Sequence, residues 1–347
     1  MNRSAVLLSL FAALALSACT TPSPVDQSAS PSSTGEPTSA SASTSEASSD
    51  ATTASATGKV MSCTDELTFD TPPKRVVMVG DDPAAYLLGL GVVDSVIGRG
   101  EDIPPGVYNA EDEKALNAIP QLEHTVPEGG GATVSTEVLL DQNPDLVISY
   151  DTGADRAALR SAGVPMYTSD QFCPDYKPVP ASFDLVAKEY EKYGKIFGKE
   201  DEAKQKIDEF QSKVDAIKAA APADLGSAMA LYVTAGDPVF YTYGNGSMIH
   251  PIMETVGLQN VYANDPNRLI GEIAVEKILE ENPDHIILLH DDNDEQAVLD
   301  TFLKSPGASD LKAVKENKVY PLPFVFTDPP SPTSVIGVEK LSEQIKK

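Results

Sequence analysis

The side chains with the most obvious chemistry are histidines and the carboxylates beside them. His290 precedes Asp291 and Asp292, and one His with two carboxylates is a ligand set that zinc or manganese accepts. The other histidines are His124, His250 and His285. Because His250 falls inside a predicted helix and His285 opens a predicted strand, the pattern does not indicate convergence on one ion. A binder of free zinc or manganese is therefore kept as an alternative only.

Two function classes are disfavoured by motif and charge. The chain has no Gly-x-Ser-x-Gly elbow, no Gly-rich phosphate loop after its first core strand and no His-Glu-x-x-His motif. Its 26 Lys and Arg against 52 Asp and Glu give a formal net charge of -26, whereas a nucleic-acid binder needs a basic face. We predict a binding protein that is not an enzyme and has no nucleic-acid partner.

Strands and helices alternate along the chain, and this order predicts parallel sheets covered on both faces. In the first half we expect strands at 75–79, 95–97, 145–149 and 165–168, and a helix at 83–90. In the second half we expect strands at 228–233, 239–243, 260–262, 285–289 and 319–322, and helices at 247–255, 275–281 and 295–303. A helical tract at 182–220, with Gly198 dividing it, separates the halves.

The two halves repeat one another. EVLLDQNPDLVIS begins at Glu137, and EKILEENPDHIIL begins at Glu276 with nearly the same letters. AAYLLGLGVVDSVIG and IMETVGLQNVYA form a second pair in the same order. The repeats predict two α/β lobes, an N-terminal lobe at 59–181 and a C-terminal lobe at 222–347, with linking helices at 182–221.

The N-terminal residues predict export and a membrane anchor. Residues 1–18 combine a short polar start with an apolar run too short to span a bilayer, which is typical of a signal peptide. Leu16-Ser17-Ala18-Cys19 resembles a lipobox, so we expect a lipid on Cys19 rather than an ordinary secretory cleavage site. Residues 19–58 are almost entirely Ser, Thr, Ala and Pro, which predicts a disordered stalk on a Gram-positive-type surface.

Three cysteines occur in the chain. With Cys19 lipidated, Cys63 and Cys173 remain as an even pair in an oxidising compartment, and we predict a disulfide bond between them.

Several motifs together resemble those of the substrate-binding lipoproteins that serve ABC importers of iron-siderophore complexes, haem and cobalamin. The motifs are the lipobox, PPKRVVMVG, GLGVVDSVIG, the repeated Asn-Pro-Asp segments and GNGSMIHPIMETVGLQNV. The resemblance implies two Rossmann-like lobes joined by a long backbone helix, the class III periplasmic-binding-protein fold, with a ligand between the lobes. It also implies a monomer that docks on a permease dimer with its ATPase, through Glu137 and Glu276 at matching motif positions.

Ligands of open α/β lobes gather at the carboxyl ends of the strands. Asp81 and Asp151 lie there, as do nine residues that we predict to bind the ligand: Asp82, Arg99, Tyr150, Thr234, Tyr243, Asn245, His290, Phe324 and Phe326. Arg268 is predicted as a further ligand contact because of its charge. The Gly244-Asn245-Gly246-Ser247 turn opens a helix and could hold an anion, or simply cap that helix.

The chemistry of these residues favours one ligand class. A trianionic catecholate siderophore would need several Arg or Lys, and the candidates include only Arg99 and Arg268. We therefore predict a hydroxamate or mixed-type ferric siderophore, with no intrinsic cofactor. Haem, held by His124 with Tyr232 or Tyr243, is the alternative, and cobalamin or another bulky cofactor remains open.

Overall fold

The computed structural model describes residues 58–127, 130–291 and 294–346. The predicted signal peptide, the lipidation site at Cys19 and all but the end of the predicted stalk lie outside the described residues. Within the described part, no helix has both the length and the apolar character that crossing a membrane requires.

The N-terminal sheet has four parallel strands in the order β4-β3-β5-β6. These strands are β3 (Val76–Met78), β4 (Val96–Arg99), β5 (Leu146–Ile148) and β6 (Met166–Tyr167). The helices of this part are α1 (Ala84–Gly89), α2 (Ala110–Asn117), α3 (Thr136–Asp141) and α4 (Arg156–Ser161). Val76, Val77, Leu146 and Val147 are fully buried, as strands covered on both faces require. An antiparallel hairpin of β1 (Lys59–Ser62) and β2 (Asp65–Thr68) precedes the sheet.

The C-terminal sheet has six strands in the order β10-β8-β7-β11-β12, with β9 also paired to β7. They are β7 (Gly226–Val233), β8 (Phe240–Tyr243), β9 (Leu258–Asn260), β10 (Leu269–Ile273), β11 (His285–His290) and β12 (Val319–Pro323). The expected purely parallel arrangement is wrong here, because β8 runs antiparallel to β7 and β10 antiparallel to β8. The connection from β7 to β8 is too short for a parallel crossover.

The sequence repeat corresponds to a repeated topology. Parallel strands β4-β3-β5-β6 of the first sheet match β9-β7-β11-β12 of the second. The helices α7 (Ile249–Thr255), α8 (Val275–Glu281) and α9 (Glu295–Leu303) follow the same order as α1, α3 and α4. The predicted α/β fold class is confirmed, and β8 and β10 are additions to the second sheet.

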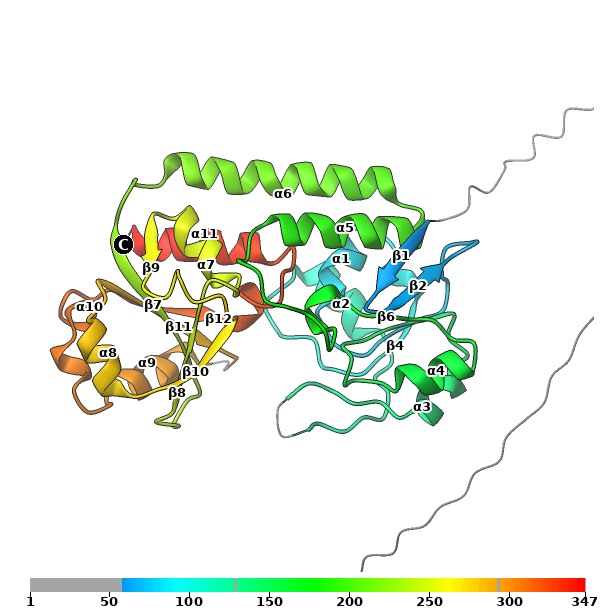
Figure 1. Cartoon of the computed structure of the whole chain (residues 1–347), viewed down its shortest axis with the longest axis horizontal. Helices are drawn as coiled ribbons and strands as arrows, with labels where there is room; N and C mark the ends of the chain where they lie inside the picture. The colour runs from blue at the N-terminus through cyan, green and yellow to red at the C-terminus, as the bar shows by residue number, and fades with distance from the viewer. Residues whose placement is uncertain (1–57, 128–129, 292–293, 347) are drawn as a thin grey trace, which may run out of the picture. The chain divides into compact units, whose positions relative to one another are not determined.

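Two helices connect the sheets along the chain. They are α5 (Asp184–Phe197) and α6 (Glu200–Ala220), and Gly198 between them has the left-handed conformation (φ 62°) that ends α5. Helix α6 packs against α5, α7 and α11 (Ser334–Ile345) (Figure 1). It therefore contacts elements from both halves, as a joining helix must. The domain boundaries at 181 and 221 remain a proposal.

The described part also contains the short helix α10 (Lys312–Lys315) and four 3-10 turns. The last of these turns, η4 (Phe324–Phe326), directly follows β12.

A cluster of aromatic residues packs α5 against α1. The Tyr86 ring stacks on Tyr193 with a centroid distance of 5.0 Å and meets Tyr190 edge-on at 4.9 Å. The Tyr86 hydroxyl donates a hydrogen bond to the carbonyl oxygen of Pro330, 2.9 Å away. This bond ties α1 of the N-terminal part to the segment between β12 and α11.

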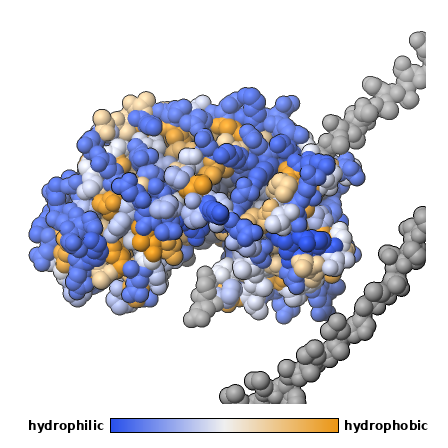
Figure 2. All heavy atoms as spheres, viewed as in Figure 1, coloured by the Kyte–Doolittle hydropathy of each residue, from blue (hydrophilic) through white to orange (hydrophobic). Residues whose placement is uncertain are grey.

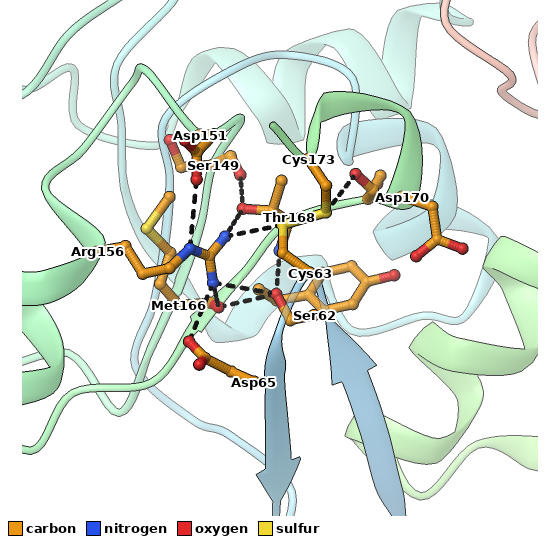
Figure 3. Close-up of a disulfide and its surroundings, with 12 residues drawn as sticks. Ser62, Cys63, Asp65, Ser149, Asp151, Arg156, Met166, Thr168, Asp170 and Cys173 are labelled. Carbon is orange, nitrogen blue, oxygen red and sulfur yellow. Dashed lines mark hydrogen bonds and ion pairs between the residues drawn. A yellow bond between two sulfur atoms is a disulfide. The ribbon is translucent and has the colours of Figure 1, made fainter. Parts of the chain in front are cut away.

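Cys63 and Cys173 form a disulfide bond with a Cα–Cα distance of 5.3 Å (Figure 3). The bond joins the β1–β2 turn to the end of the 3-10 turn η2 (Asp170–Phe172). Beside it the Arg156 guanidinium contacts Asp65 at 3.5 Å and Asp151 at 3.3 Å. Asp151, one of the strand-end candidates, is thus engaged in an ion pair.

Candidate functional site

A cavity of about 1000 Å³ lies at the carboxyl ends of the strands and takes its lining from both sheets. The molecular surface is hollowed between the parts built on the two sheets (Figure 2). A volume of this size fits a bulky small molecule. The position agrees with the general rule for open α/β sheets.

The wall from the N-terminal sheet is acidic. Asp81 and Asp82 follow β3, and Glu101 follows β4, which pairs with β3. The backbone N–H of Asp81 donates to Glu101 Oε2 at 3.1 Å, and the Tyr150 hydroxyl donates to Glu101 Oε1 at 3.2 Å. Burial, reinforced by Glu101, raises the pKa of Asp81, and burial with Asp81 raises the pKa of Asp82. Asp81 and Asp82 therefore resist being ionised together.

The wall from the C-terminal sheet is more mixed. His290 ends β11 and is almost fully buried, and Asp291 follows it. The Tyr232 hydroxyl donates to Asp291 Oδ2 at 2.8 Å. The Phe324 ring lines the cavity and lies edge-on to Tyr232, with a centroid distance of 5.4 Å. This wall therefore offers an aromatic face next to a carboxylate.

Asp328 is the most buried carboxyl group of the cavity lining, only 3% exposed. The Ser247 hydroxyl donates to its Oδ2 atom, whereas its Oδ1 atom has no hydrogen-bond partner among the described residues. Burial raises the pKa of Asp328 to about 6, although the positive charge of Arg268 opposes that rise. A buried acceptor without a partner is costly unless a bound group supplies a donor.

Negative charge dominates the lining as a whole. Eight of the described lining residues carry carboxyl groups, namely Asp81, Asp82, Glu101, Asp102, Asp291, Asp294, Glu295 and Asp328. Lys340 is the one Lys or Arg among the described lining residues, and its ammonium lies 5.6 Å from the centre of the Phe326 ring. This charge balance suits a neutral or cationic ligand better than an anionic one.

A family profile described as periplasmic binding protein matches residues 76–325. The chain belongs to the periplasmic binding protein family. The resemblance drawn from the motifs is thereby confirmed, and the chain is a ligand-binding protein of an ABC importer rather than an enzyme.

Individual relatives agree with the family and differ in their ligands. A crystal structure described as an ABC-type Fe3+-hydroxamate transport system from Saccharomonospora viridis shares 36% identity and a TM-score of 0.76, covering 84% of this chain and 99% of that one. The uncharacterized ABC transporter substrate-binding lipoprotein YvrC of Bacillus subtilis is 25% identical over 81% of this chain and 82% of its own length. The Fe(3+)-citrate-binding protein YfmC of the same species is 24% identical over 77% and 81%.

The strand-end rule brings several predicted residues of this binding protein into the cavity. Asp82, His290, Phe324 and Phe326 line it, together with Asp81 and His124. Ligand contact by each of them remains a proposal. The other predicted residues do not line it: Arg99, Tyr150, Thr234, Tyr243, Asn245, Arg268 and Tyr232.

Arg99 supports the cavity wall from behind. Its side chain is buried, and its guanidinium donates to the carbonyl oxygens of Ile119 at 3.3 Å and of Glu101. It also contacts Asp102 Oδ1 at 3.5 Å. Because these bonds use the guanidinium to fix the loop after β4, we correct its predicted role from ligand contact to support.

Tyr150 and Asn245 are likewise used for structure. The Tyr150 hydroxyl lies within hydrogen-bond distance of both Ala132 O and Glu101 Oε1, and its single proton can be donated to either. The Asn245 side chain donates to Ala263 O at 2.7 Å. The glycines beside Asn245 allow close packing, since a Cβ on Gly244 would lie 2.5 Å from the carbonyl oxygen of Asn267. The turn therefore packs on backbone and does not line the cavity.

The remaining predicted residues lie near the lining or at the surface. Tyr243 is buried, with its ring centroid 5.8 Å from that of Phe324. Thr234 and Arg268 are exposed. Thr234 directly follows the parallel strand β7, but it is not part of the cavity lining. Arg268 directly precedes β10, whose start pairs with the end of β8, and the antiparallel direction of β8 carries that end away from the carboxyl end of β7.

Sequence reasoning missed part of the lining. Glu101, Asp102 and the segment from Ile103 to Tyr108 all line the cavity. Their signal was available, because Pro104-Pro105-Gly106 marks a loop directly after the strand that ends at Arg99. Asp328 was missed because it lies in irregular backbone beyond the short turn η4.

The metal alternative involved His290, Asp291 and Asp292, of which Asp292 lies outside the described residues. No group of three or more His, Cys, Asp or Glu side chains in the described part is arranged to hold an ion. His285 has a structural role, since its ring nitrogens contact the Tyr320 hydroxyl and the Leu225 carbonyl oxygen.

Glu137 and Glu276 occupy equivalent places. Each is the second residue of its helix, α3 or α8, and each side chain is exposed. Both helices lie before the matching strands β5 and β11. Their role in docking remains a proposal.

Proposed function

We propose that this periplasmic binding protein captures a ferric hydroxamate siderophore in the cavity and delivers it to an ABC permease. The observation that carries the proposal is the charge of the cavity, because only one Lys or Arg occurs among its described lining residues. The same lining also provides an aromatic wall. Three hydroxamate groups carry three negative charges, which cancel the charge of Fe3+. Their complex therefore needs no cluster of Arg or Lys, unlike an anionic catecholate or citrate complex.

The 36% identical structure described as an Fe3+-hydroxamate transport system supports the same ligand class. In the proposal the aromatic ring of Phe324 covers an apolar face of the chelate. Polar groups at the strand ends then fix its orientation, as in other small-molecule sites. The relative named for Fe(3+)-citrate shares less sequence, and an anionic citrate complex would meet eight carboxyl groups.

Haem is the second candidate, and one side chain favours it. His124 lines the cavity, and its Nδ1 atom lies 3.0 Å from the Leu122 carbonyl oxygen. When Nδ1 donates to that carbonyl, the Nε2 atom carries no proton, and its lone pair could serve as an axial ligand to the haem iron. Against haem, the Tyr232 hydroxyl is bonded to Asp291. The propionates of haem would also face the acidic walls.

The rest of the proposal concerns delivery. Export, the lipid on Cys19 and the stalk at 19–58 would hold a monomer outside the cytoplasmic membrane, next to its permease dimer. Glu137 and Glu276 would contact one permease subunit each, because they occupy equivalent positions in the repeat. ATP hydrolysis by the partner ATPase would then release the chelate.

Visible absorption and native mass spectrometry of the full-length mature protein would test the ligand class. The probes are ferrioxamine B, ferric citrate, haem and cobalamin, each titrated separately. We expect ferrioxamine B to bind with a dissociation constant of about 1 μM or tighter, and the other probes to bind at least about tenfold more weakly. Tight binding of haem or cobalamin with no binding of the hydroxamate would overturn the proposal.

A further inference from the structure

Three carboxyl groups of the cavity form one acidic wall, which we define as Asp81, Asp82 and Glu101. They follow the adjacent parallel strands β3 and β4, and a hydrogen bond of 3.1 Å from Asp81 N–H to Glu101 Oε2 joins the two segments. The charge of Asp291, from the C-terminal sheet, also acts on Asp81. Carboxylates on both sides of the cavity therefore repel one another while no cation lies between them.

Arg99 behind the cavity wall and Lys340 in the lining are engaged elsewhere. The Arg99 guanidinium binds backbone carbonyls and Asp102. The Lys340 ammonium lies over the Phe326 ring. Among the described residues, neither Arg99 nor Lys340 forms an ion pair with a carboxyl group of the acidic wall.

An independent observation comes from Asp328. Its side chain is 97% buried in the cavity lining, yet its Oδ1 atom has no partner in the described part of the chain. Native structures leave few buried acceptors of this kind. A donor on the ligand would satisfy the Oδ1 atom.

We infer that the chelate bound in this cavity carries a protonated amine, which is held by the acidic wall of Asp81, Asp82 and Glu101. Asp328 Oδ1 accepts a hydrogen bond from a second N–H group of the same chelate. The inference rests on the proposed hydroxamate function and adds the charge of the ligand. An ammonium group satisfies carboxylate acceptors through charge-assisted hydrogen bonds, which are stronger than neutral ones. A neutral chelate leaves the repulsion in the acidic wall uncompensated.

The sharpest test keeps the chelate constant and changes only its amine. Ferrioxamine B has a free ammonium group, its N-acetyl derivative is neutral there, and its N-succinyl derivative carries a carboxylate. Affinities of the full-length mature protein for the three would be measured by isothermal titration. We expect the amine to bind about 10- to 100-fold more tightly than the acetyl form, and the succinyl form to bind most weakly.

Variants then locate the effect. Asp81→Asn with Asp82→Asn should reduce the preference for the amine over the acetyl form to less than about threefold, because two acceptors lose their charge. Asp328→Asn should weaken the amine and acetyl forms by similar factors and so preserve the preference, because it alters the acceptor of the second N–H group and leaves the acidic wall intact. Glu272→Gln, an exposed carboxylate on β10 outside the lining, is the control and should preserve the preference. Circular dichroism would verify that each variant is folded.

The outcomes separate the two proposals. Equal affinities for the amine and acetyl forms overturn the inference and leave the hydroxamate function standing. A preference that survives in the folded Asp81→Asn, Asp82→Asn variant also overturns it. If none of the three ferrioxamines binds to the wild-type protein, the hydroxamate function fails, and this inference fails with it.

Discussion

Asp284 accepts hydrogen bonds from both the backbone N–H and the hydroxyl of Ser227, each at 2.9 Å. Ser227 lies at the start of β7, and Asp284 directly precedes the parallel neighbour β11. Asp145 makes the equivalent contacts before β5, accepting from the N–H groups of Lys74 and Arg75 at 2.8 and 2.9 Å. The Asp of each repeated Asn-Pro-Asp turn therefore fixes the beginning of a neighbouring strand.

This contact predicts a stability effect at Asp284. The ammonium of Lys312, with the Ser227 N–H, holds the pKa of Asp284 well below its usual range. A lowered folded pKa means that the carboxylate stabilises the fold above about pH 4 and loses this contribution as the pH falls further. Asp284→Asn should lower the free energy of unfolding by about 1–3 kcal/mol at pH 7.

Urea unfolding at several pH values would measure the effect. The difference between wild type and Asp284→Asn should shrink as the pH is lowered from 7 to about 3. Asp94→Asn, an exposed surface change, serves as the control and should have little effect. A pH-independent difference would contradict the assigned role of the carboxylate.

The repeat also explains how much of the fold could be predicted. Asn143 and Asn282 both have positive φ, 47° and 41°, so the turn needs a residue that tolerates this conformation, and Pro then stops the helix. Local chemistry of this kind can be recognised from sequence. The antiparallel direction of β8 could not be recognised, because periodicity gives a strand's burial and not the direction of its partner. The strand β10 was not among the expected strands.

The disulfide predicts a second stability effect. The bond between Cys63 and Cys173 closes a loop with a sequence separation of 110 residues. In the chain-entropy account such a loop stabilises the folded state by about 4–5 kcal/mol. Cys63→Ser with Cys173→Ser should lower the unfolding free energy by roughly this amount in urea titrations. Adding a reductant should destabilise the wild type and leave the double variant unchanged.

The site was less predictable than the fold. A sequence shows which residues follow a strand, and this was enough to find Asp82 and His290. It does not show whether a side chain turns toward the cavity or back into the protein. Arg99 turns back because the carbonyl oxygens of Ile119 and Glu101 need donors inside the loop. Long-range hydrogen-bond partners of this kind have no local sequence signal.

The proposed docking role predicts a separation of binding from uptake. Glu137→Arg with Glu276→Arg should leave ligand affinity unchanged, since neither residue lines the cavity, and should reduce iron uptake by cells at least about tenfold. The matched control is Glu111→Arg with Glu200→Arg, which reverses two exposed carboxylates in the first turns of α2 and α6. Normal uptake with the first pair, or equal loss with the second, would contradict a specific role for the matched positions.

Ligand binding should depend on pH through the acidic wall. Burial and the neighbouring Glu101 raise the pKa of Asp81, so part of the population of the empty protein holds a proton there near neutral pH. An ammonium group favours the ionised carboxylate and must release this proton. Affinity for ferrioxamine B should therefore increase with pH, by up to about tenfold per unit for one released proton, and level off above the raised pKa.

Other groups at the cavity must be separated from Asp81 in this experiment. Some titratable groups act on Asp81 or line the same cavity. They are Asp82, Glu101, Asp291, Tyr108, His124 and His290. Protonation of a histidine at acid pH would also weaken a cationic ligand, so the pH profile of the wild type alone is not decisive. Titrating Asp81→Asn in parallel removes one carboxyl group and leaves both histidines. Its profile should be flatter by about one proton, and buffers of different ionisation enthalpy should report correspondingly fewer protons released; an unchanged slope would exclude Asp81 as their source.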